Sequence, residues 1–221
     1  AGSYMYIGPQ GIVHGTTITI LNASRKIGDH NNSKNLRLFV SSGLGGMSGA
    51  QPKAAKIAGC ISVIAEINPK PLMIRHSQGW VDEIHDDCNK IIRRIEEARK
   101  AGTPVSIAYH GNIVDLWEKL ADANVKVDIG SDQTSLHNPF SGGYYPAGLT
   151  FGESNKMMVE NPDAFAAEVK RSLRRHADAI NRHTSQGMYF FDYGNAFLLE
   201  ASRAGADVTD AGGKLDRKST R

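Results

Sequence analysis

The strongest constraint on the fold of this chain is a glycine-rich loop that joins an apolar run to a helical pattern. The run Leu36–Ser41 leads into GLGGMSG, which is followed by a predicted helix, Gln51–Ala58, and a second apolar run, Ile61–Ala65. A strand, a glycine loop, a helix and a second strand in this order are typical of a βαβ unit, whose two strands are parallel. This stretch therefore predicts an α/β fold.

The same alternation continues along the chain. Short apolar runs with turn residues nearby predict three further strands, at Val105–Ala108, Lys126–Ile129 and Tyr189–Phe191. Further helices are predicted at Gly79–Lys100, Ile113–Ala123, Pro162–Gln186 and Asn195–Ala204. Strands that alternate with helices in this way imply a Rossmann-like parallel sheet with helices on both faces.

Length and the distribution of apolar residues suggest how the chain is organised. A chain of 221 residues is within reach of one large α/β domain. The last stretch, 209–221, has few apolar residues, so we expect one domain over 1–208 and a loosely packed polar tail over 209–221. The chain starts without an initiator methionine, in what reads as the middle of a domain, and we expect it to be a piece of a longer protein.

Composition argues against several classes of function. The net charge is only +3 and the basic residues are dispersed, which argues against nucleic acid as a partner; the densest basic segment, SLRRH at 172–176, is predicted to be a solvated helix face. No apolar run is long enough to span a membrane. The eight histidines show no metal-binding spacing, so no metal is expected. Two cysteines without a CxxC pair, Cys60 and Cys88, fit a reducing, cytoplasmic compartment and are expected to be inert core residues.

The glycine loop itself has the pattern of a dinucleotide cradle with one change. Such a cradle uses one glycine for the turn out of the strand, one for close approach to a pyrophosphate and one for helix packing. Here Ser48 stands where the GxGxxG pattern has its last glycine, and Gly49 follows it. The pattern alone also allows a plain glycine-rich turn, but its position between a strand and a helix favours phosphate binding.

An acidic residue at the end of the second predicted strand suggests which cofactor the loop would take. Glu66 follows Gly43 by 23 positions, close to the spacing of about 20 in dinucleotide-binding units. A carboxylate there accepts hydrogen bonds from ribose hydroxyls and repels a 2′-phosphate. The sequence therefore favours NAD over NADP.

Two polar loops follow later strands, on the side of a parallel sheet where ligands bind. In the first, Asn112 can either cap the next helix or contact a ligand, and capping is the better-supported role from the residues alone. The second, Asp128–Pro146, is rich in hydrogen-bonding groups and contains two glycines followed by two tyrosines. A polar loop of this length at a strand end favours a functional role.

Four segments of the chain, in order, resemble one known family. YIGPQGIVHGT, SGLGGMSGAQPKAA, GSDQTSLHNP and FDYGNAFLLEASRAGADV are similar to the central NAD-binding domain of the urocanate hydratase (urocanase) family. The resemblance implies a cytosolic enzyme, usually a homodimer, that adds water to urocanate to give imidazolone propionate in histidine breakdown. It also implies that tightly bound NAD⁺ acts as an electrophile toward the imidazole of the substrate.

The resemblance also assigns binding residues. Cofactor contacts are expected at the glycine loop and Glu66, at Asn112, in the long polar loop and in the FDYGN segment: Gly45, Gly46, Met47, Ser48, Glu66, Asn112, Gln133, Thr134, Ser135, His137, Tyr144 and Tyr193. Pro71 stands where many members have an arginine near the adenosine ribose, so Lys70 or Arg75 is expected to replace that cation.

The resemblance places the family's reactive-site cysteine outside this chain, so no catalytic residue is assigned and the chain alone is not expected to hydrate urocanate. The alternative is a self-sufficient NAD-dependent oxidoreductase. That function would require a Tyr-x-x-x-Lys pair or a His/Asp proton relay beside the nicotinamide, and we find neither arrangement in the sequence.

Overall fold

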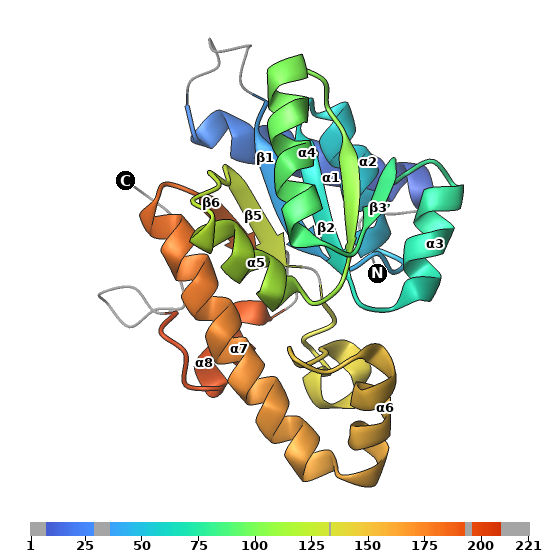
Figure 1. Cartoon of the computed structure of the whole chain (residues 1–221), viewed down its shortest axis with the longest axis vertical. Coiled ribbons are helices and arrows are strands. Elements are labelled where there is room, and N and C mark those ends of the chain that lie inside the picture. Colours follow the sequence, from blue (N-terminus) through green and yellow to red (C-terminus); the bar gives the residue numbers. More distant parts are fainter. Residues whose placement is uncertain (1–7, 29–35, 133, 193–195, 209–221) are drawn as a thin grey trace.

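The computed structural model describes residues 8–28, 36–132, 134–192 and 196–208. Within these residues, six strands form one sheet in the order β3-β4-β2-β1-β5-β6, and every neighbouring pair is parallel. The strands are β1 (Leu38–Ser42), β2 (Ile61–Glu66), β3 (Glu83–His85), β4 (Ser106–His110), β5 (Ile129–Asp132) and β6 (Tyr189–Asp192). This arrangement, drawn in Figure 1, confirms the predicted Rossmann-like parallel sheet.

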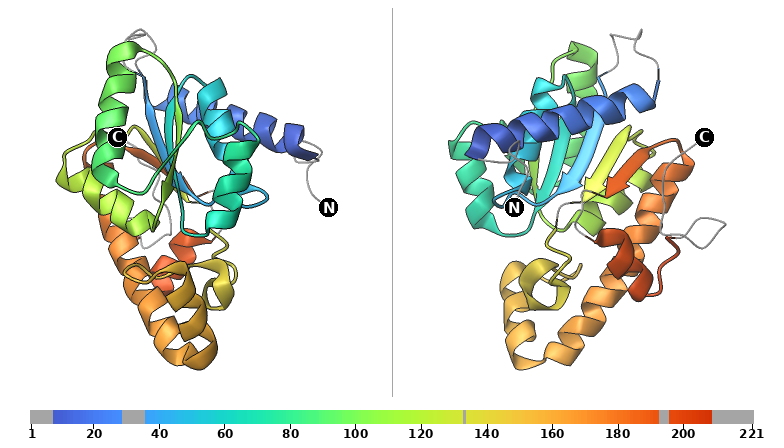
Figure 2. Two further views of the ribbon diagram at one scale, coloured as in Figure 1. Left: turned by 45° about the vertical axis from the view of Figure 1, so that its right-hand side comes forward. Right: turned by 180° about the vertical axis from the view of Figure 1, so that it is seen from behind.

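Helices cover both faces of the sheet, as predicted (Figure 2). One face packs against α1 (Gly8–Lys26), α2 (Gln51–Ile57) and α3 (Pro69–Ser77). The other packs against α4 (Cys88–Ala101), α5 (Ile113–Asp122), α7 (Pro162–Ser185) and α8 (Phe197–Arg203). The central strands β1 and β2 are buried on both faces, so they lack the alternation of apolar and polar residues that half-exposed strands show.

The long helix α7 extends beyond the sheet, where α6 (Phe151–Glu160) packs along its first half (Figure 1). The start of α6 is fixed by a capping box: the Thr150 hydroxyl accepts from the Glu153 N–H, and the Glu153 carboxylate accepts from the Thr150 N–H. Together, α6 and the first half of α7 form an arm that extends beyond the carboxyl edge of the sheet.

The order of the strands creates a switch point beside β1. β1 pairs with β2 on one side and with β5 on the other, so the chain leaves β1 in one direction and returns to its other side later. The loops after β1 and β5 diverge at this point, which is where open parallel sheets bind ligands.

Several predicted elements differ from the structure. The predicted helix Gly79–Lys100 is wrong in its first part, because the edge strand β3 pairs with β4 there and α4 begins only at Cys88, after Asp87 caps it by accepting from the Asn89 N–H. The last predicted strand before the polar loop is three residues too early, since β5 starts at Ile129. Helices α1, α3 and α6 were not predicted. The predicted tail, 209–221, lies outside the described residues.

Candidate functional site

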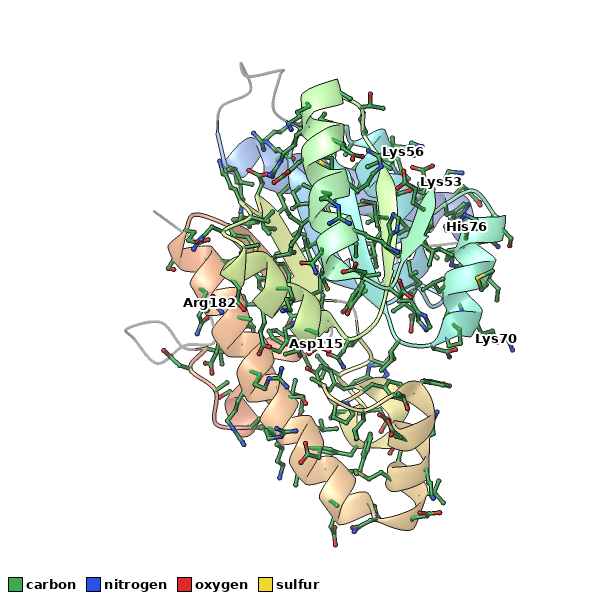
Figure 3. The ribbon with its side chains drawn as sticks, in the orientation of Figure 1. Lys53, Lys56, Lys70, His76, Asp115 and Arg182 are labelled. Carbon is green, nitrogen blue, oxygen red and sulfur yellow. The ribbon has the colours of Figure 1, made fainter. Side chains whose placement is uncertain are left out.

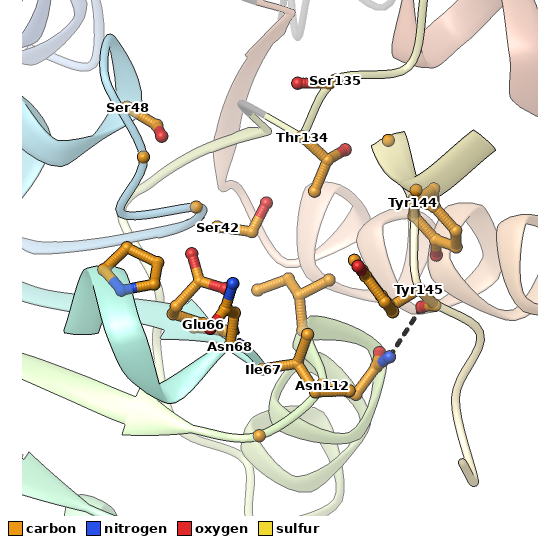
Figure 4. Close-up of a pocket in the computed structure, with 18 residues that line it drawn as sticks. Ser42, Ser48, Glu66, Ile67, Asn68, Asn112, Thr134, Ser135, Tyr144 and Tyr145 are labelled. Atoms are coloured by element: carbon orange, nitrogen blue, oxygen red, sulfur yellow. Dashed lines mark hydrogen bonds between the residues drawn. The ribbon is translucent and has the colours of Figure 1, made fainter. Parts of the chain in front are cut away.

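A cleft of about 240 Å³ lies at the carboxyl edge of the sheet, across the switch point. Its walls come from the loops that follow four neighbouring strands, β1, β2, β4 and β5 (Figure 4). The lining residues are Ser42, Gly43, Gly45 and Ser48 at the end of β1 and after it; Ala65, Glu66, Ile67, Asn68 and Pro71 at the end of β2 and after it; Gly111, Asn112 and Ile113 after β4; and Thr134, Ser135 and Gly142–Tyr145 after β5.

The glycine loop forms one wall. Gly43 has a φ of +86°, which glycine adopts without strain, and its N–H donates to the Ala65 carbonyl at 2.8 Å. The next N–H, of Leu44, donates to the Glu66 carboxylate at 2.8 Å. The N–H groups of Gly46, Met47 and Ser48 have no acceptor in the described part of the chain. Three such donors ahead of a helix suit an anion.

Arg75 of α3 holds the glycine loop from outside. Its guanidinium donates to the carbonyls of Leu44 at 3.1 Å and Gly45 at 2.6 Å, and it lies over the Trp80 ring. A Cβ on Gly49 would overlap this guanidinium. The displaced last glycine of the loop therefore makes room for Arg75.

Glu66 joins the loop after β2 to the glycine loop. One carboxylate oxygen accepts from Leu44 N and the other from Asn68 N, each at 2.8 Å. Burial raises the pKa of this carboxyl group, and the backbone N–H donors partly offset the shift. Three backbone donors, of Leu44, Ile67 and Asn68, leave at least one of the four lone pairs of this carboxylate for another donor, such as a ribose hydroxyl.

Asn112 has the capping role that the residues alone favoured. Its side-chain oxygen accepts from the Val114 N–H at 2.9 Å and starts α5. Its amide nitrogen donates to the Tyr145 carbonyl at 2.8 Å, so the same side chain ties the loop after β4 to the tyrosine segment (Figure 4). Asn112 also lines the cleft, and its predicted cofactor contact remains a prediction.

The wall after β5 rests on buried side chains. Asp132 accepts from the Ser42 hydroxyl at 2.6 Å and from the Thr134 hydroxyl at 2.5 Å. The Tyr144 hydroxyl lies 3.2 Å from Nδ1 of His176, a fully buried residue of α7. Sequence reasoning missed Asp132 and His176 as site residues. The segment 172–176 is not simply a solvated face, because Ser172, Leu173 and His176 point into the core.

The structure brings together seven of the twelve predicted cofactor residues around the cleft: Gly45, Ser48, Glu66, Asn112, Thr134, Ser135 and Tyr144. Gly46 and Met47 belong to the glycine loop but do not line the cleft, and His137 is exposed and does not line it either. Gln133 and Tyr193 lie outside the described residues. The lining residue Tyr145 was missed, although its sequence signal, a second tyrosine after two glycines, was visible.

The two candidates for the cation expected beside the ribose, Lys70 and Arg75, lie in different surroundings. Lys70 is exposed in the first turn of α3 (Figure 3), whereas Arg75 is committed to the glycine-loop carbonyls. Burial lowers the pKa of Arg75. Pro71 itself lines the cleft. Of the two candidates, only Arg75 contacts the loop directly.

A second cavity of about 510 Å³ lies on the other side of the turn after β4. It shares Ile67, Gly111 and Asn112 with the cleft and extends to the start of α6 at Thr150–Gly152. An extended ligand therefore has space on both sides of this turn.

The remaining features of the described residues concern the cysteines, metal binding and membrane spans. Cys60 and Cys88 are both buried, and burial raises the pKa of each thiol, to about 11 for Cys60, as expected of inert core residues. Within the described ranges, no group of three or more His, Cys, Asp or Glu side chains is placed to hold a metal ion. None of the helices in those ranges is long and apolar enough to cross a membrane.

Comparison with known proteins gives a consistent result. Residues 8–216 match the family Urocanase, described as the Urocanase Rossmann-like domain. The chain is 59% identical to a probable urocanate hydratase of Caenorhabditis elegans over 94% of its length, and 56% identical to urocanate hydratase of Mus musculus over 96%. A probable urocanate hydratase of Halobacterium salinarum is 34% identical over 97% of the chain. The chain spans about a third of the length of these relatives, from 31% to 36%.

Proposed function

The chain belongs to the urocanase family, and from this premise we propose that it is the NAD-binding domain of a urocanate hydratase. The observation that carries the proposal is the cleft at the switch point, where a glycine loop, three of whose N–H groups have no acceptor among the described residues, lies beside a carboxylate at the end of β2. A Rossmann-like domain points to a nucleotide cofactor, and these two features support NAD as that cofactor.

The residues present fit a dinucleotide with an unmodified adenosine ribose. The N–H groups of Gly46, Met47 and Ser48 are proposed to bind the pyrophosphate; in support, they lie at the start of a helical segment and have no acceptor among the described residues. Glu66 can accept from a ribose hydroxyl with a lone pair that its backbone donors leave open. The same carboxylate would repel a 2′-phosphate.

The remaining predicted contacts, Gln133, Thr134, Ser135, His137, Tyr144 and Tyr193, are proposed to surround the other end of the cofactor. When bound, NAD⁺ supplies an electrophilic nicotinamide ring. Thr134 and Tyr144 line the cleft where they can orient that ring. Because the chain spans only about a third of the length of its relatives, hydration of urocanate to imidazolone propionate is proposed for the whole protein. The whole protein is also proposed to be cytoplasmic and to form a homodimer.

Family membership favours this proposal over a self-sufficient NAD-dependent oxidoreductase. A buried Asp132–His176–Tyr144 cluster is present, but Tyr144 is only 1% exposed and its hydroxyl is therefore not accessible to a substrate. The cluster consequently offers no proton relay of the kind that the oxidoreductase alternative requires.

The test compares binding of NAD⁺ and NADP⁺ by isothermal titration calorimetry. We expect NAD⁺ to bind more tightly by about tenfold or more, because the Glu66 carboxylate faces the 2′-phosphate. Glu66→Ser should narrow the gap, whereas Glu97→Ser, at an exposed position of α4, should leave it unchanged. Equal affinities in the unmodified chain would remove Glu66 from this role, and no binding of either dinucleotide would refute the proposal for the domain.

A further inference from the structure

Three side chains of the cleft depend on one buried carboxylate. Asp132, at the end of β5, has no exposed surface. One of its oxygens accepts from the Ser42 hydroxyl at 2.6 Å, and the other accepts from the N–H and the hydroxyl of Thr134 at 3.0 and 2.5 Å. Ser42 ends β1, whereas Thr134 lies in the loop after β5, and both line the cleft. A single carboxylate therefore sets the orientation of both hydroxyls.

The third side chain, Tyr144, is linked to Asp132 through His176. Nδ1 of His176 lies 3.2 Å from the Tyr144 hydroxyl, and Nε2 lies 3.9 Å from the Asp132 carboxylate. His176 is fully buried, and its Nε2 has no hydrogen-bond partner in the described part of the chain. Asp132 is the anionic group that this nitrogen faces.

Protonation fixes the direction of these contacts. Burial lowers the pKa of His176 to about 4, although Asp132 opposes the shift, so the imidazole is neutral and carries one proton. Burial also raises the pKa of Tyr144 well above its ordinary value, so the phenol keeps its proton. With the imidazole proton on Nε2, facing the Asp132 carboxylate, Nδ1 can accept from the Tyr144 hydroxyl. The opposite tautomer would set a lone pair against the carboxylate.

The hydroxyl of Tyr144 is thus occupied by the protein, and the residue is only 1% exposed, so it forms part of the base of the cleft. The Tyr144 and His176 rings are inclined by 28°, and their centroids are 6.1 Å apart. The Phe197 ring packs against the His176 ring, with 4.6 Å between their centroids. Figure 4 shows Ser42, Thr134 and Tyr144 around the same cleft. Two oriented hydroxyls beside a buried aromatic base suit a planar ring with polar substituents.

We propose that Asp132 and His176 are positioning residues, which hold Ser42, Thr134 and Tyr144 in place for the planar ring of a bound dinucleotide. Neither residue needs to contact the ligand. The proposal rests on the proposed function, since the dinucleotide is the ligand that the cleft is argued to bind. Fixing a contact surface through buried partners improves binding because less freedom is lost when the ligand arrives.

The first experiment measures NAD⁺ affinity of variants by calorimetry, with thermal unfolding to show that each variant is folded. Asp132→Asn should weaken NAD⁺ binding about tenfold, since a disrupted buried network releases three cleft side chains. Asp128→Asn is the matched control: Asp128 is a buried carboxylate just before β5 that accepts from the Leu38 N–H, away from the cleft. It should lower stability and leave affinity unchanged.

The second experiment separates positioning from simple packing. His176→Asn keeps an acceptor near the position of Nδ1, whereas His176→Leu removes it, so affinity should be nearly retained in the first and reduced about tenfold in the second. Nitrogen-15 NMR of the ligand-free chain, with His176 assigned from the spectrum of His176→Asn, should show the proton on Nε2.

Two kinds of result would overturn the proposal. One is a folded Asp132→Asn variant with the NAD⁺ affinity of the unmodified chain; the other is His176 protonated on Nδ1. The two proposals fail separately. An unmodified chain that binds no NAD⁺ refutes the proposed function, while the tautomer of His176 still decides whether the network has the direction inferred.

Discussion

The two walls of the cleft are built in different ways. The glycine wall consists of Gly43–Ser48 with Glu66 and Arg75, and almost all of its hydrogen bonds have a backbone N–H or carbonyl on one side. The tyrosine wall consists of Thr134, Ser135 and Gly142–Tyr145, and it rests mainly on side chains of Asp132, His176 and Asn112. One wall is a backbone structure, and the other is a side-chain network.

This difference determines how each wall responds to change. A backbone wall tolerates many side chains, provided that glycine remains where φ is positive or space is short. A buried side-chain network fails when one partner is lost, because the others are left without hydrogen bonds in an environment of low dielectric. Mutations should therefore lower stability more in the tyrosine wall than in the glycine wall, where they should weaken binding with little loss of stability.

The largest expected effect is in the tyrosine wall, from Gly143→Ala. A Cβ at Gly143 would overlap the backbone carbonyl oxygens of Ser135 and Asn138, which are not flexible side-chain ends. The loop must shift as a whole, and we expect the free energy of unfolding to fall by about 3 kcal/mol. Urea denaturation followed by tryptophan fluorescence measures this loss.

The neighbouring glycine provides the matched control. Gly142 has a φ of +86°, but a Cβ there would meet no atom closer than 3.8 Å. Gly142→Ala should therefore lose only the backbone term, about 1–2 kcal/mol. Equal losses in the two variants would mean that conformational strain, and not overlap with the Ser135 and Asn138 carbonyls, governs this segment.

A smaller effect concerns the acid stability of the same wall. The pKa of His176 is about 4 in the folded state against 6.5 for an ordinary histidine. Above pH 6.5 the imidazole is neutral in both states and contributes no pH dependence. As the pH falls below 6.5 the unfolded state binds a proton that the folded state does not, so stability is lost until about pH 4.

At pH 5 this loss amounts to about 2 kcal/mol. His176→Asn cannot titrate there, so the free energy of unfolding of the unmodified chain should drop more steeply between pH 7 and pH 5 than that of the variant. His183, whose pKa is also lowered by burial, is present in both proteins and cancels in the difference. Parallel pH profiles would contradict a buried neutral His176.

The same contrast explains what could be predicted from the sequence. The glycine wall was predictable because its parts lie within one βαβ unit: Gly43 and Glu66 are 23 positions apart and follow a known spacing. The tyrosine wall was predictable only in its loop residues. Asp132 meets Ser42 across 90 positions and His176 meets Tyr144 across 32, and no local pattern shows which of eight histidines is buried.

Errors in the fold have a related cause. The apolar spacing from Trp80 to Ile95 predicts one helix, but β3 exists because β4 offers a free edge that the local sequence does not reveal. The residues of α1 form a helix that packs on α2 and contributes Ile20 and Ala23 to the core. That helix carries glycines and β-branched residues, which weaken its local signal.

The smallest expected effect on stability is in the glycine wall, from Gly46→Ala. The backbone at Gly46 is not left-handed, and a Cβ there would meet no atom within 4 Å, so the free energy of unfolding should change by less than about 0.5 kcal/mol. Binding should respond differently, because the methyl group would take the space through which a pyrophosphate approaches the loop N–H groups. NAD⁺ affinity should fall by about tenfold, whereas adenosine, which has no phosphate, should bind as before. Calorimetry with both ligands measures the split: an equal loss for adenosine, or a marked loss of stability, would show that Gly46 supports the shape of the wall and not its approach to a phosphate.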